Sequence, residues 1–153
     1  MTGHSPIEAR RFRISAHWSA LPSLLLLWAG LTLIIKRLTR RPAAVAATTS
    51  AAITLGHILS DLWHQLGHAA AARLTGYPMR GLRFWTIMIA SFYPPDEPPL
   101  PAKIHLRRAL GGPIASALLT LLLGILARAL KPSLARRTIW FLCLENLFAF
   151  TLQ

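Results

Sequence analysis

Residues 57–68 read HILSDLWHQLGH and place three histidines and an aspartate in an otherwise apolar run. On an ideal helix, at about 100° per residue, His57, Asp61, His64 and His68 lie within roughly 60° of one another. Ionisable side chains are costly inside a bilayer and normally face the protein interior. The spacing therefore predicts a helix with one polar stripe that is directed toward the rest of the protein.

His64 and His68 are one helical turn apart, a spacing that lets two imidazoles reach one Zn²⁺ ion. His57 is about two turns from His64, too far to share that ion. Asp61 could orient the imidazole of His64 through a hydrogen bond. The stripe could equally be a hydrogen-bonded contact between helices without a metal, and the spacing alone leaves both interpretations open.

The composition is that of a membrane protein. Of the 153 residues, 54% are hydrophobic and only 14% are charged, whereas soluble domains carry about 25% charged residues. Seventeen Lys and Arg against five Asp and Glu give a net charge of +12, and the basic residues cluster between apolar runs. This arrangement favours contact with anionic membrane lipids and argues against nucleic acid as a partner. The single cysteine, Cys143, lies in an apolar run and is expected to be a packing residue.

Four apolar segments, at 16–35, 43–66, 109–127 and 138–153, predict about four transmembrane helices. The basic residues behind the first segment are typical of a stop-transfer sequence, so a retained helix is favoured over a signal peptide. The last segment has sixteen residues, roughly 24 Å of helix, which is too short for a full crossing. Either this helix enters the membrane without leaving it, or the chain is truncated at its C-terminus, which is the alternative we favour.

The orientation of these helices in the membrane is not determined by charge. The two sides carry nine and eight Lys and Arg, so the positive-inside rule gives no decision. In the third segment Gly112 and Ser116 are four residues apart, which indicates a small-residue packing face.

The loop between the second and third segments has two parts. Residues 81–93 are rich in aromatic and β-branched residues, which predicts one or two short strands. Residues 94–101 read PPDEPPLP and must be extended. The loop is either a plain interfacial connection or a strand edge that pairs with an unwound polypeptide. The predicted fold is thus an all-α polytopic membrane domain over residues 1–153, with a short β-like, proline-rich interfacial loop between helices 2 and 3.

Two quoted stretches carry a resemblance to a known family. LWHQLGHAAAARLTGYPMRGLRFW (62–85) and HLRRALGGPIASALLTLLLGIL (105–126) resemble the site-2 protease family of intramembrane zinc metalloproteases. In that family one transmembrane helix carries HExxH, often as HELGH, and a later helix carries an Asn and then an Asp that is the third zinc ligand. The resemblance implies that His64 and His68 are zinc ligands and that Asn146 is a substrate or oxyanion contact.

The chain departs from the family pattern at two points. Gln65 stands where the family has the glutamate that acts as general base, and an amide has no basic carboxylate to take the proton. No Asp follows Asn146, although catalytic zinc normally has three protein ligands. Zinc is therefore expected to bind weakly or not at all. Glu145 or Asp61 could substitute as a ligand; otherwise Glu145 is expected to be protonated or to hydrogen-bond with His57.

Three functions are left open by these observations. The chain could be a membrane zinc protease that is altered or incomplete, or a pseudoprotease that binds transmembrane partners without cutting them. It could also be a membrane scaffold or lipid-binding protein in which the histidines are structural. We expect a multi-pass integral protein of the plasma (inner) membrane of a prokaryote, site-2 protease-like in fold and impaired in catalysis.

Overall fold

A computed structural model describes residues 12–152 of the chain, which are mostly helical. The helices, in chain order, are α1 (Ala20–Thr39), α2 (Ala43–Leu74), α3 (Ala102–Ala129), α4 (Leu134–Glu145) and the π-helical segment η1 (Asn146–Thr151). The strands are β1 (Arg13–Ala16), β2 (Gly81–Trp85) and β3 (Met88–Phe92).

Three of the helices are long and apolar enough to cross a membrane: α1 with 20 residues, α2 with 32 and α3 with 28. This confirms the prediction of a mostly helical chain with several membrane-spanning helices. The fourth predicted span, residues 138–153, is not confirmed. That part of the chain forms the 12-residue helix α4 and then the 6-residue segment η1.

The helices α2 and α3 extend beyond the apolar segments predicted for them, because apolar composition marks the lipid-facing part of a helix and not its ends. Helix α2 continues to Leu74 and stops before Gly76, whose positive φ of 79° favours glycine. Helix α3 begins directly after Pro101, so its first turns include the charged residues that precede the apolar run. Pro113 lies inside α3 and does not end it.

The three strands form one sheet in the order β1-β2-β3, with β1 parallel to β2 and β2 antiparallel to β3. The hairpin β2–β3 confirms that strands occur between residues 81 and 93. The all-α prediction is corrected by the sheet, and most of all by β1, for which no strand is predicted from the sequence. The signal was missed because β1 has four residues and its partner β2 lies more than 60 residues further along the chain.

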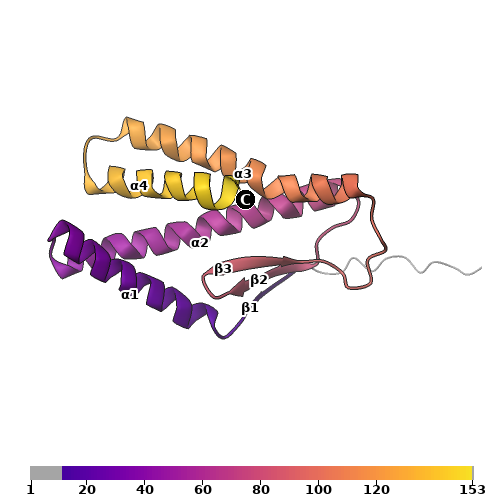
Figure 1. Ribbon diagram of the computed structural model, residues 1–153, viewed down its shortest axis with the longest axis horizontal. Coiled ribbons are helices and arrows are strands. Elements are labelled where there is room, and N and C mark those ends of the chain that lie inside the picture. Colours follow the sequence, from indigo (N-terminus) through magenta and orange to yellow (C-terminus); the bar gives the residue numbers. More distant parts are fainter. Residues whose placement is uncertain (1–11, 153) are drawn as a thin grey trace, which may run out of the picture.

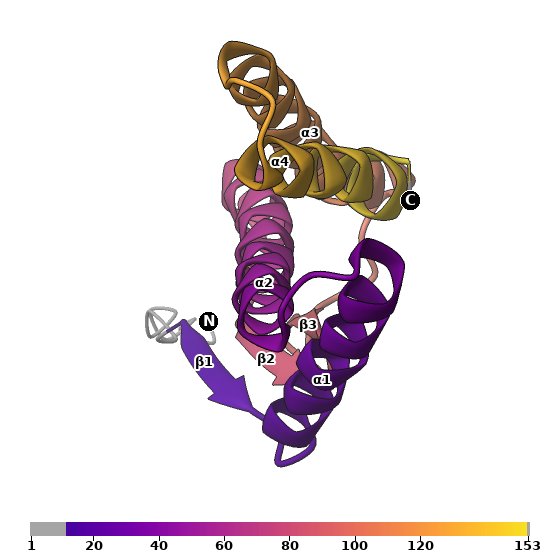
Figure 2. The ribbon, with the colours of Figure 1, turned by 90° about the vertical axis from the view of Figure 1, so that its left-hand side faces the viewer.

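Helix α2 is the central element of the molecule. It lies between α3 and α4 on one side and α1 and the sheet on the other, as Figure 2 shows end-on. The α1–α2 turn and the α3–α4 turn lie at the same end, on the left in Figure 1, and the proline-rich loop lies at the opposite end. A small core at the sheet contains Ala72, Met79, Leu82 and Ile89.

The crossing of α2 and α3 depends on two glycines in direct backbone contact. A Cβ atom placed on Gly67 would overlap the carbonyl oxygen of Gly111, and one placed on Gly111 would overlap that of Gly67. Small residues allow membrane helices to approach this closely. The crossing brings the histidine-bearing face of α2 against α3.

Candidate functional site

The polar stripe of α2 divides between two neighbours. His64 and His68 face α3. Asp61 and Gln65 face strand β3, and His57 faces the turn that precedes it. The helical spacing predicted one polar stripe. In the structure the stripe divides into two neighbouring rows of side chains, one that contacts α3 and one that contacts the β2–β3 hairpin.

The imidazoles of His64 and His68 meet above Gly112 of α3. Their Nε2 atoms lie 3.0 Å apart, and a Cβ atom on Gly112 would overlap both Nε2 atoms. His68 Nδ1 lies 2.9 Å from the carbonyl oxygen of Arg108, and His64 Nδ1 lies 3.0 Å from Ser116 Oγ. Gly112 and Ser116, predicted to form a helix-packing face, do pack against α2, and the side chains they meet there are the two histidines.

These partners determine where the protons of the pair can be. A carbonyl oxygen only accepts, so His68 donates through Nδ1 to Arg108 and presents the lone pair of its Nε2. His64 can then donate from Nε2 to His68 while Ser116 donates to its Nδ1. Because a serine hydroxyl both donates and accepts, His64 can also reverse its tautomer and present a second Nε2 lone pair.

The pair fits two ligands of a zinc ion but not a complete zinc site. With Zn–N bonds of about 2.0–2.1 Å and tetrahedral angles, two ligand nitrogens are separated by roughly 3.3 Å, close to the observed 3.0 Å. The backbone carbonyl on Nδ1 of His68 is a partner that metal-binding histidines usually have. However, residues 12–152 contain no group of three His, Cys, Asp or Glu side chains that could hold a metal. No catalytic step can therefore be derived through zinc.

Gln65 is held by strand β3. Its Nε2 donates to the carbonyl oxygen of Ile89 at 2.7 Å, and Ser91 Oγ donates to its Oε1. Asp61 accepts from the backbone N–H of Ile89 at 2.5 Å and from Gln65 Nε2 at 3.4 Å, and it is 1% exposed. Asp61 was expected to orient His64; its carboxylate instead binds the strand, and Ser116 takes that role.

His57 connects α2 to both α4 and the tip of the hairpin. Its Nδ1 lies 2.7 Å from Glu145 Oε1, and its Nε2 donates to the carbonyl oxygen of Ile87 at 2.7 Å. The hydrogen bond between Glu145 and His57 was one of the alternatives for this carboxylate. The bound oxygen of Glu145 is directed to His57, so the structure gives it no contact with the histidine pair.

Asn146 is fully buried at the junction of α4 and η1. Its Nδ2 donates to Ser60 Oγ at 2.8 Å and to the carbonyl oxygen of Leu142 at 3.0 Å, and its Oδ1 has no hydrogen-bond partner among residues 12–152. Asn146 therefore holds α4 against α2.

The π-helical segment η1 covers the face of α2 next to the histidine pair. The ring centroid of Phe150 lies 5.8 Å from the ring centroids of both His57 and His64.

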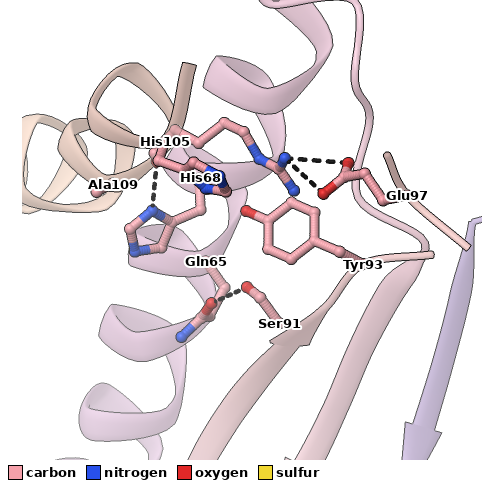
Figure 3. A pocket seen from close by; sticks show the side chains of 8 residues that line it. Gln65, His68, Ser91, Tyr93, Glu97, His105 and Ala109 are labelled. Atoms are coloured by element: carbon pink, nitrogen blue, oxygen red, sulfur yellow. Dashed lines mark hydrogen bonds and ion pairs between the residues drawn. The ribbon is translucent and has the colours of Figure 1, made fainter. Parts of the chain in front are cut away.

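A cavity of about 530 Å³ opens beside His68, between α2, α3 and β3 (Figure 3). Its lining residues are Gln65, His68, Ser91, Tyr93, Glu97, His105, Arg108 and Ala109. In its wall Arg108 Nη1 donates to both oxygens of Glu97, at 3.0 and 2.9 Å, and its guanidinium lies 3.5 Å from the ring centroid of Tyr93. The sequence carries no specific signal for these three residues: the loop and α3 are consecutive in the chain, but only the fold brings Arg108 back onto Glu97 and Tyr93.

Comparisons of the chain with protein-family models, with curated proteins and with solved structures gave no match.

Proposed function

We propose that this chain is a site-2 protease-like membrane protein that holds a transmembrane segment of a partner without cleaving it. In this proposal the histidine pair binds zinc weakly, and the cavity beside His68 receives an unwound part of the partner. In this proposal the protein resides in the plasma membrane of a prokaryote. Helix α4 and segment η1 together form a fourth apolar segment in the bilayer. They have 18 residues, which is about 27 Å at the rise of an α-helix.

The observation that carries the proposal is the environment of Gln65. In a zinc hydrolase with an HExxH motif, the glutamate after the first histidine exchanges a proton with metal-bound water. Here the amide nitrogen and the amide oxygen are both hydrogen-bonded to β3, and neither atom of an amide is basic. Residue 65 is thus part of the packing between α2 and the sheet, which supports a role in holding a partner and not in cleaving it.

The location and polarity of the cavity support partner binding. It combines hydrogen-bonding side chains such as Ser91 and His105 with the aromatic ring of Tyr93. Binding sites generally combine apolar surface with a few polar groups, as this cavity does. An unwound membrane segment needs such polar groups, because its free backbone amides have no water to bind inside a bilayer.

The proposal can be tested in liposomes that contain the chain and a doubly tagged single-span reporter protein with a Gly-Pro break in its span. A photo-crosslinking residue replaces Tyr93 in the cavity wall, and the control replaces Leu26, which is 74% exposed on α1. We expect cross-linking at position 93 above that at position 26, an uncut reporter, and less than one zinc per chain by mass spectrometry.

Two results would contradict the proposal. Reporter cleavage together with stoichiometric zinc, both lost in His64→Ala, would make the chain a protease. Equal cross-linking at positions 93 and 26 would leave a membrane scaffold or lipid-binding protein as the function.

A further inference from the structure

The outer edge of β3 is bonded to side chains of α2 in the way that an edge is bonded to a neighbouring strand. Ile89 donates its N–H to Asp61 and accepts from Gln65 at its carbonyl oxygen. A partner strand would make the same two bonds to one residue of an antiparallel pair. At the tip of the hairpin, His57 donates to the carbonyl oxygen of Ile87.

The spacing of these contacts follows from the geometry of the two elements. His57, Asp61 and Gln65 are four residues apart, which is about 6 Å along a helix. His57 binds the carbonyl oxygen of Ile87, Asp61 and Gln65 both bind the backbone of Ile89, and Gln65 also accepts from the side chain of Ser91. Residues 87, 89 and 91 lie two apart, which is about 6.6 Å along a strand. The two repeats match from Ile87 in the turn to Ser91 in β3, so one face of α2 follows the strand over this stretch.

The turn that this face holds is unfavourable by itself. Thr86 has a positive φ of 53°, and a β-branched residue rarely adopts that conformation. The hydrogen bond from His57 to the carbonyl oxygen of Ile87 fixes the residue that directly follows Thr86. His57 is in turn fixed by Glu145 of α4.

We infer that α2 completes the sheet: its side chains at positions 57, 61 and 65 occupy the β3 edge in place of a fourth strand, and Gln65 is the residue that closes it. An extended polypeptide can add to β3 only after Gln65 and Asp61 release Ile89. This inference concerns the protection of β3 and does not depend on the proposed function.

The chemistry of the edge requires an amide at position 65 and not a carboxylate. An ionised glutamate has no donor for the carbonyl oxygen of Ile89. It would also bring a second negative charge next to Asp61, since Gln65 Nε2 lies 3.4 Å from Asp61 Oδ1. Where both carboxyl groups are ionised they repel each other beside an unsatisfied carbonyl, and Gln65→Glu then opens the edge more than a neutral substitution does.

The test is residue-resolved amide hydrogen exchange in lipid nanodiscs at pH 8, corrected for intrinsic rates. In Gln65→Met, which keeps the length of the side chain but cannot bond, we expect the Ile89 amide to exchange about fivefold faster, the value of one hydrogen bond. In Gln65→Glu we expect about tenfold or more. The amides of α3 should keep their native rates in both variants.

A matched control separates release of the edge from a general loss of stability. Gly67→Ala destabilises the α2–α3 crossing without touching β3. It should accelerate exchange throughout the bundle without singling out Ile89. An unchanged Ile89 amide in Gln65→Met, or the same uniform acceleration as in Gly67→Ala, would overturn the inference. Gln65→Met carries the test by itself if the glutamate variant does not fold.

Discussion

Gly112 leaves the space in which the rings of His64 and His68 meet. Both rings are fixed on their other sides, His64 by Ser116 and His68 by the carbonyl oxygen of Arg108. They cannot turn away from an added methyl group without losing these bonds. The absence of a side chain at residue 112 is therefore a condition for the histidine pair.

Gly112→Ala is expected to lower the free energy of unfolding by about 1–3 kcal/mol, the usual cost of added bulk in a packed interior. Unfolding in mixed detergent micelles measures the effect. Gly30→Ala is the matched control, because a Cβ atom there meets nothing within 4 Å and gains the same helix propensity of about 1 kcal/mol. Equal stability of the two variants would show that the rings move freely.

The sequence predicts well which residues of one helix lie side by side. It predicts poorly which residues of different elements are in contact. The i, i+4 spacing placed His64 beside His68, because both residues belong to one helix. It could not assign Asp61 to Ile89, because the target is a backbone N–H group and carries no residue-specific signal. Gly112 was likewise recognised as a small residue, but not as the neighbour of the histidines.

At the scale of elements, the α2–α3 crossing is highly sensitive to added volume. Gly67→Ala and Gly111→Ala each place a methyl group against a backbone carbonyl of the opposite helix, and backbone cannot move aside as a side chain can. Each variant is expected to lose about 1–3 kcal/mol of stability in detergent relative to Gly30→Ala. A loss no larger than in that control would mean that the helices can separate slightly without cost.

The loop between β3 and α3 is fixed by the ion pair of Glu97 and Arg108. Arg108 is 4% exposed, so Glu97→Gln leaves a buried charge without its partner. We expect a stability loss on the order of 3 kcal/mol. The double variant Glu97→Gln/Arg108→Met should recover part of this loss, because it removes the uncompensated charge as well. If the double variant were the less stable of the two, the contact of Arg108 with Tyr93 would outweigh the ion pair.

At the scale of the whole molecule, the arrangement predicts which loops share a side of the membrane. The α1–α2 turn and the α3–α4 turn lie at one end, and the proline-rich loop lies at the other (Figure 1). In a Cys143→Ser background, cysteines replacing Arg41 and Lys131 should react with a membrane-impermeant maleimide from the same side. A cysteine replacing Pro99 should react from the opposite side, and labelling of all three from one side would exclude the arrangement.

The membrane-spanning helices could be predicted because lipid selects apolar composition locally along the chain. The sheet could be predicted only in part: the hairpin is local, whereas β1 pairs with a strand that follows two helices. Residues 134–151 were harder to predict, because the composition of α4 and η1 is intermediate between that of a membrane-spanning helix and that of a buried helix. The side of the membrane is not encoded, since the basic residues are nearly balanced.

The contact between Gly67 and Gly111 also restricts how this molecule can move. With no side chain between the two backbones, neither helix can turn about its own axis or slide past the other without overlap. Helices α2 and α3 therefore move as one rigid body that carries the histidine pair with it. Any opening toward the cavity must come from displacement of the hairpin, α1 or α4 relative to that body, at hinges in the turns that join them.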